Sequence, residues 1–248
     1  MIGEWRVPRP GMLSVRPCCP EPSLQRAGPL GPRVPTLWTF GDSVLDCAHY
    51  NRHRVHPAGL MLRNDDLLFP AFRGRDLQHQ DPSWRLEHRA VDGARVDGLA
   101  RQARGTGTRQ EDVALVSIGG NDLLGGLLED EGPGFARFQE TLEEALRSLR
   151  PARLLIANVY DPTFGDDPGD FTGADLRLAR ANLRRMNDLL AGVARRHGEP
   201  VDLHGHFLTG SPAWFTATIE PSLEGASEVR RVFLDHVQAA PRPREVGT

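Results

Sequence analysis

Lysine is absent from this 248-residue chain, so arginine supplies every fixed side-chain cation. We interpret the absence as a genomic preference for arginine codons. The formal net charge is only −3, which gives no electrostatic basis for binding nucleic acid or an anionic membrane surface. No apolar run approaches the ~20 residues that cross a bilayer, and no secretory signal is visible at the start. The expectation is a cytoplasmic protein without a membrane span.

Cysteine is also scarce, with three residues, of which Cys18 and Cys19 are adjacent. Such a set does not form a disulfide framework. No glycine-rich phosphate loop follows the first predicted strand, which argues against a nucleotide-binding domain. The acid-rich turn with Asp161, Asp166 and Asp167 is interpreted as a solvated loop, so no metal is expected.

The N-terminal segment differs in composition from the rest of the chain. Residues 1–34 are rich in proline, arginine and glycine and show no sustained periodicity. Each proline fixes φ and removes a backbone donor, so we predict a poorly ordered extension there. Residues 35–240 then form one domain, which the length of the chain allows.

Strand-like and helix-like patterns alternate within residues 35–240. Short apolar runs predict strands at 36–40, 113–118, 153–159 and 199–204. Helical patterns follow, and we expect helices at 44–50, up to about 104, 134–149, 174–197 and 223–237. The intervening residues 51–89 are polar and irregular, which is long for a loop in an α/β domain. The alternation predicts an α/β fold, a parallel sheet with helices on both faces.

Three residues with potential for acyl-transfer chemistry come just after strand ends or at turns of the same kind. Ser43 supplies a hydroxyl nucleophile, and Asn121 supplies a side-chain amide donor. Gly93 offers a backbone N–H with no side chain to block a substrate, and the Ser43 N–H is a third donor. Because ligands bind beyond the carboxyl ends of parallel strands, we expect these residues to gather at one edge of the sheet.

The motifs around these residues resemble those of the SGNH (GDSL-type) hydrolases. The matching blocks are Gly41-Asp42-Ser43, then Gly93 in Val91-Asp92-Gly93-Ala94, then Gly119-Gly120-Asn121-Asp122, in the family's order. The resemblance extends over residues 35–237. It implies a flavodoxin-like three-layer α/β/α fold and hydrolysis of a small-molecule ester through an acyl-enzyme on Ser43.

The fourth block departs from the family pattern. The family usually has Asp-x-x-His-Pro before the last helix, whereas this chain has Ala217 at the Asp position and Glu220 at the His position. Either the base has moved or Glu220 itself accepts the proton, if burial raises its pKa. On a predicted strand, residues 202, 204 and 206 share a face, so His206, and second His204, become candidates for the base.

Two further Asp-x-x-His matches involve His49 and His79, and both are weaker candidates. His49 lies on the helix predicted after Ser43 and is expected to point away from it, whereas His79 lies in the irregular segment. The leading expectation is therefore an esterase, lipase or acyl-carbohydrate esterase without a cofactor. The alternative is a catalytically silent binding protein of the same fold, and the side chain that lies beside Ser43 distinguishes the two.

Overall fold

The structure is a computed structural model that describes residues 34–151, 153–166 and 169–239. The predicted N-terminal extension, apart from Val34, lies outside the described residues, as do Cys18 and Cys19. Among the helices of the described ranges, none is long and apolar enough to cross a membrane.

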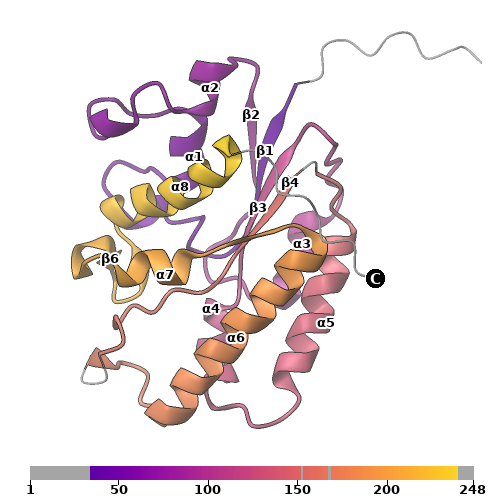
Figure 1. The fold of residues 1–248 in the computed structure, drawn as a ribbon, viewed down its shortest axis with the longest axis vertical. Helices are drawn as coiled ribbons and strands as arrows, with labels where there is room; N and C mark the ends of the chain where they lie inside the picture. The colour runs from indigo at the N-terminus through magenta and orange to yellow at the C-terminus, as the bar shows by residue number, and fades with distance from the viewer. Residues whose placement is uncertain (1–33, 152, 167–168, 240–248) are drawn as a thin grey trace, which may run out of the picture. The chain divides into compact units, whose positions relative to one another are not determined.

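A five-stranded parallel sheet forms the centre of the domain (Figure 1). Its strand order is β2-β1-β3-β4-β5, which is the flavodoxin-like order. The predicted α/β fold is thereby confirmed. The strands are β1 (Thr36–Gly41), β2 (Arg85–His88), β3 (Val113–Ser117), β4 (Arg153–Ala157) and β5 (Glu199–Val201).

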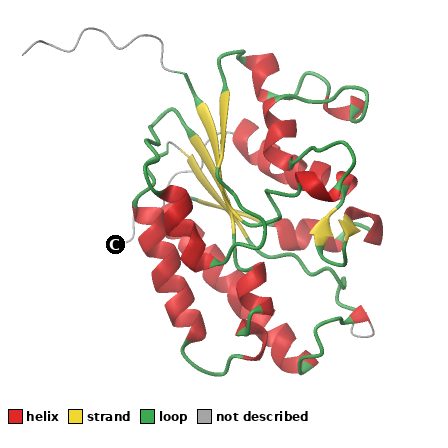
Figure 2. Ribbon diagram, turned by 180° about the vertical axis from the view of Figure 1, so that it is seen from behind, coloured by secondary structure: helices red, strands yellow, loops and turns green. Residues whose placement is uncertain are grey.

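Helices cover both faces of this sheet, because its central strands bury side chains in both directions (Figure 2). In β3, Ala114 and Val116 belong to one apolar core, and Val113 and Leu115 belong to the other. The first core is completed by α3 (Val96–Ala103), α5 (Gly134–Arg147) and α6 (Leu176–His197). The second is completed by α1 (Pro57–Leu62), α7 (Leu203–Leu208) and α8 (Leu223–Gln238).

The segment 51–89, predicted as an irregular loop, contains regular structure. It holds α1, a 3₁₀ turn η2 (Pro70–Phe72), α2 (Leu77–Gln80) and the edge strand β2. Strand β2 has the sequence Arg-Leu-Glu-His and only half-buried or exposed side chains. It is a strand because it pairs with β1, from Thr36↔Arg85 to Thr39↔His88, and not because its sequence is apolar.

Two other predicted elements are shorter in the structure than the sequence indicated. The expected strand at 199–204 ends at Val201, because Asp202 accepts a hydrogen bond from the Gly205 N–H at 2.8 Å and caps helix α7. The expected helix at 44–50 is reduced to a 3₁₀ turn, η1 (Ala48–Tyr50). Ser43 therefore lies in a turn and not at the N-terminus of an α-helix.

Candidate active site

Strand β1 delivers Ser43 to the carboxyl edge of the sheet through a tight backbone turn at Gly41. Gly41 has φ +125°, and a Cβ there would overlap the Ser117 carbonyl oxygen of β3. The Gln102 side chain from α3 holds the same residue, accepting from the Gly41 N–H at 2.6 Å and donating to its carbonyl at 2.8 Å. Ser43 follows two residues later and is 6% exposed.

The predicted glycine and asparagine blocks lie against this turn. The Val91 N–H donates to the Gly41 carbonyl at 2.9 Å, which places the Gly93 turn beside β1. Asn121, in α4 (Gly120–Leu124), donates from Nδ2 to the Ala94 carbonyl at 3.1 Å. The structure thus brings the Ser43, Gly93 and Asn121 segments together, as the sequence predicted.

Donors for an oxyanion are available at this edge. Within the described residues, the backbone N–H groups of Ser43 and Gly93 donate to no protein acceptor. The Asn121 amide uses one N–H on Ala94 and retains a second. Gly93 has φ +72°, and no atom lies within 4 Å of the Cβ position, so a substrate can approach the backbone.

Glu220 reaches Ser43 from a small antiparallel hairpin. The hairpin consists of β6 (Phe215–Thr216) and β7 (Glu220–Pro221), and the Tyr160 hydroxyl fixes it by donating to the Ile219 carbonyl at 2.7 Å. Burial raises the pKa of Glu220, and hydrogen bonding from the Ser43 hydroxyl partly offsets the rise. Oxygen Oε2 of Glu220 is buried without a hydrogen-bond partner among the described residues. A buried carboxylate therefore stands beside the serine.

The turn that leads into Glu220 is strained. Ala217 has φ +45° and Thr218 has φ +76°, although neither is glycine. A β-branched residue in this region is a genuine outlier, and such residues persist only where the surrounding structure holds them in place. The strain lies within the block that presents the carboxylate to Ser43.

The two histidines predicted on a common strand face lie instead on helix α7, where they point to different partners. His206 Nε2 pairs with Glu228 Oε2 of α8 at 2.9 Å, and its ring stacks on Trp214. His204 Nδ1 is 3.1 Å from the Val159 carbonyl oxygen. Neither histidine contacts Ser43 in the described structure, and a catalytic role for His206 stays a prediction.

His49 lies nearer to the site than the sequence suggested. Its Nε2 is 3.0 Å from Asp92 Oδ2, and the Tyr50 hydroxyl donates to the same oxygen at 3.0 Å. The charge of His49 lowers the pKa of Glu220, and that of Asp92 raises it. His49 lies within the 3₁₀ turn η1 and not on an α-helix, and its ring pairs with Asp92 of the Gly93 loop.

Asp42 is a second buried acid next to the serine. Burial raises the pKa of Asp42 to about 8; the negative charges of Glu220 and Asp122 add to the rise, and the Val44 N–H hydrogen bond opposes it. Asp42 is therefore largely protonated at neutral pH.

This shift predicts a pH-dependent stability. The folded pKa of about 8 lies above the ordinary value of 3.8, so the folded state binds more protons between these values. The free energy of unfolding should therefore fall as pH rises toward 8, and Asp42→Asn should flatten the slope. Urea unfolding at pH 6.5, 7.25 and 8 measures this change in the free energy of unfolding. The range avoids most of the titration of Asp122, because burial raises the pKa of Asp122 to about 6. Equal slopes for both proteins would contradict the assignment.

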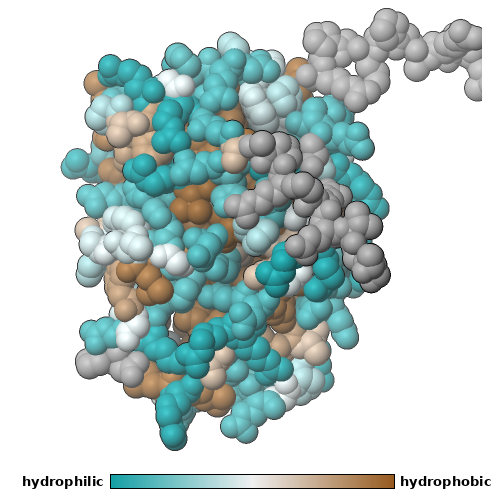
Figure 3. Space-filling view, in the orientation of Figure 1, coloured by the Kyte–Doolittle hydropathy of each residue, from teal (hydrophilic) through white to brown (hydrophobic). Residues whose placement is uncertain are grey.

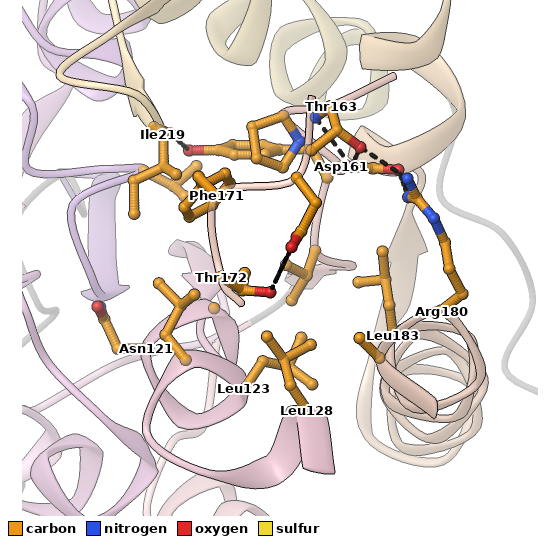
Figure 4. Close-up of a pocket in the computed structure, with 18 of the residues that line it drawn as sticks. Asn121, Leu123, Leu128, Asp161, Thr163, Phe171, Thr172, Arg180, Leu183 and Ile219 are labelled. Atoms are coloured by element: carbon orange, nitrogen blue, oxygen red, sulfur yellow. Dashed lines mark hydrogen bonds and ion pairs between the residues drawn. The ribbon is translucent and has the colours of Figure 1, made fainter. Parts of the chain in front are cut away.

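A cavity of about 120 Å³ opens from Ser43 toward helix α6 (Figure 4). In this view Asn121 lies at one end of the cavity and Arg180 at the other, with Leu123 and Leu128 on the α4 side. No group of three or more His, Cys, Asp or Glu side chains that could hold a metal ion occurs in the described part of the chain.

Comparison with known proteins identifies the family of the chain. The model of the GDSL-like lipase/acylhydrolase family matches residues 39–226, a span that includes Ser43, Gly93, Asn121 and Glu220. The chain belongs to this family. No curated protein matches this GDSL-like family member.

Solved structures share its fold at low sequence identity. The lipase/acylhydrolase from Enterococcus faecalis is 17% identical with a TM-score of 0.57, over 84% of this chain and 98% of that one. A lipolytic protein of the G-D-S-L family from Veillonella parvula is 16% identical with a TM-score of 0.53, over 81% and 97%. The esterase EstA from Pseudoalteromonas is 13% identical with a TM-score of 0.51, over 82% and 96%. At such identities the likeness concerns the fold alone.

Proposed function

We propose that the protein hydrolyses neutral carboxylic esters through an acyl-enzyme on Ser43. The observation that carries the proposal is the buried Glu220 carboxylate beside the Ser43 hydroxyl. The Gly93 loop and Asn121, which offer oxyanion donors, are bonded to the same end of the sheet. A nucleophile, a base and oxyanion donors are the groups that ester hydrolysis requires. This arrangement favours an enzyme over a catalytically silent binding protein.

The proposed reaction begins with attack of the Ser43 Oγ on the ester carbonyl carbon while Glu220 accepts the hydroxyl proton. The backbone N–H groups of Ser43 and Gly93 and the Asn121 amide hold the oxyanion. Glu220 then protonates the alcohol oxygen, the C–O bond breaks, and the acyl group stays on Ser43. A water molecule attacks the acyl-enzyme, Glu220 takes its proton, and release of the acid returns that proton to Ser43.

Glu220 is a better candidate for the base than His206. His206 is already paired with Glu228, and the two groups form a link between α7 and α8. Because its pKa is raised, Glu220 is ionised over a narrower range of pH than an exposed glutamate. A raised pKa also makes the carboxylate a stronger base once it is ionised. In this proposal Glu220 stands where the family's histidine is usually found.

Labelling with a fluorophosphonate tests the nucleophile. The Pseudoalteromonas esterase was crystallised in a form inhibited by monoethylphosphonate. We expect one adduct on the peptide that contains Ser43, found by mass spectrometry, and none in Ser43→Ala. An adduct on another residue, or no adduct at any pH, would instead favour the alternative that the chain is a catalytically silent binding protein.

A further inference from the structure

The cavity beside Ser43 indicates which ester the protein takes. We propose that it binds the acyl chain of the substrate, so that the protein prefers apolar acyl groups of medium length over acetyl. This inference rests on the proposed function and chooses an esterase of lipid-like acyl groups over an acyl-carbohydrate esterase. We call this space the acyl cavity, lined by Ser43, Asn121, Leu123, Leu128, Leu176 and Leu183.

The walls of the acyl cavity are mainly hydrocarbon. On one side are Leu123 of α4 and Leu128 of the 3₁₀ turn η3 (Leu127–Glu129), and on the other are Leu176 and Leu183 of α6. Val159, Phe171 and Ile219 complete the apolar surface. Transfer of an acyl chain from water to such a surface is favourable in proportion to the area buried.

The polar side chains along the cavity are already bonded to protein. Asp161 accepts from Thr163 and pairs with Arg180 at the α6 end of the cavity (Figure 4). Thr172 donates to Asp170 at 2.9 Å.

Other polar side chains that line the cavity also form hydrogen bonds within the protein. The Tyr160 hydroxyl donates to the Ile219 carbonyl, and Asn158 donates to Asp202 at 2.8 Å. A sugar would leave its hydroxyl groups unpaired against such a wall, whereas an alkyl chain requires no hydrogen bonds.

The position of the acid and the oxyanion donors separates the acyl side from the alcohol side. Asn121 lines the cavity, so a carbonyl held by its amide has one substituent in the acyl cavity. Glu220, the group that would protonate the alcohol oxygen, does not line it. The alcohol therefore leaves on the Glu220 side, and the chain in the cavity is the acyl group.

Apolar side chains also surround the entrance. Phe171 and Leu124 line the cavity and are nevertheless 42% and 44% exposed. Figure 3 shows apolar residues at the lower left of the face, around a hollow beside the loop that follows β4. An ester with an apolar chain gains contact with these residues before it reaches Ser43.

Two series of p-nitrophenyl and alkyl esters test the proposal. With p-nitrophenol as the constant alcohol, kcat/KM should rise about fourfold per added methylene from acetyl to hexanoyl, the effect of burying one CH₂ at about 0.8 kcal/mol. With acetyl as the constant acyl group, lengthening the alcohol should produce no such rise. A rise in the alcohol series alone, or no rise in either, would overturn the proposal.

Variants of α6 locate the effect. Leu183→Trp should fill the acyl cavity and lower the hexanoyl-to-acetyl ratio of kcat/KM at least tenfold. Leu178→Trp carries the same substitution on the same helix outside the cavity lining and should keep the wild-type ratio. If Leu183→Trp fails to fold, Leu183→Ala should still flatten the chain-length dependence. An unchanged ratio in every folded Leu183 variant would contradict the assignment.

Binding of N-methylalkanamides, measured by calorimetry on the wild-type protein, separates this inference from the proposed function. Affinity that rises with chain length and falls in Leu183→Trp supports the acyl cavity, even if no ester is hydrolysed and the proposed function fails. Affinity that is independent of chain length overturns the acyl cavity, even if esters are hydrolysed.

Discussion

Glu220→Gln is expected to lower kcat/KM for ester hydrolysis by about 10²- to 10⁴-fold, the usual contribution of a positioned general base. Glutamine has nearly the same shape but cannot accept the Ser43 proton. Because burial raises the pKa of Glu220, a neutral side chain should leave the stability of the fold intact. A melting temperature equal to that of the wild-type protein would show that Glu220→Gln loses activity because the base is missing and not because the variant is misfolded.

The pH dependence gives the same prediction a second readout. The base acts when ionised, so activity should fall as pH falls through the pKa of Glu220, and this acid limb should lie above that of an ordinary glutamate. His206→Gln is the matched control. Because His206 pairs with Glu228, we expect it to retain activity and the same acid limb. A lost acid limb in His206→Gln, with Glu220→Gln still active, would assign the base to the histidine.

Gly41→Ala is expected to destabilise the fold by roughly 2–5 kcal/mol. The new Cβ would overlap the Ser117 carbonyl oxygen, and overpacking of this kind costs about 1–3 kcal/mol. The φ of +125° adds about 1–2 kcal/mol for any residue with a side chain. In addition, a displaced strand end would lose both hydrogen bonds to Gln102.

Gly105→Ala provides the control for Gly41→Ala. Gly105 also has a positive φ, +71°, but nothing lies within 4 Å of its Cβ position. It should therefore lose only the conformational contribution of about 1–2 kcal/mol. Thermal unfolding measures the difference, at about 2–4 °C per kcal/mol for a protein of this size. Equal melting temperatures for the two variants would contradict this prediction, because they would show that β3 moves enough to accommodate a side chain at position 41.

Continuous apolar runs made the central strands predictable, because burial on both faces leaves a signature in the sequence itself. Strand β3 was predicted at 113–118 and occupies Val113–Ser117. The edge strand β2 was missed, since its Arg-Leu-Glu-His sequence gains strand structure only by pairing with β1. Short elements of this kind depend on tertiary contacts that no local pattern encodes.

In the candidate site, too, some residues could be placed from the sequence and others could not. The motifs of Ser43, Gly93 and Asn121 follow strand ends or turns, and the parallel topology brings them together as predicted. The placement of His206 could not be predicted in the same way. Asp202 caps helix α7 by accepting a hydrogen bond from the Gly205 N–H, so residues predicted to end a strand begin this helix instead. As a result, the His206 imidazole lies beside Glu228.

Hydrolysis of p-nitrophenyl butyrate by the wild-type protein and by Ser43→Ala tests the central claim most directly. The account predicts release of p-nitrophenol by the wild-type protein and only the background rate in a folded Ser43→Ala variant. Equal activity in both proteins, or no activity of the wild type on any ester of a broad panel, would contradict it.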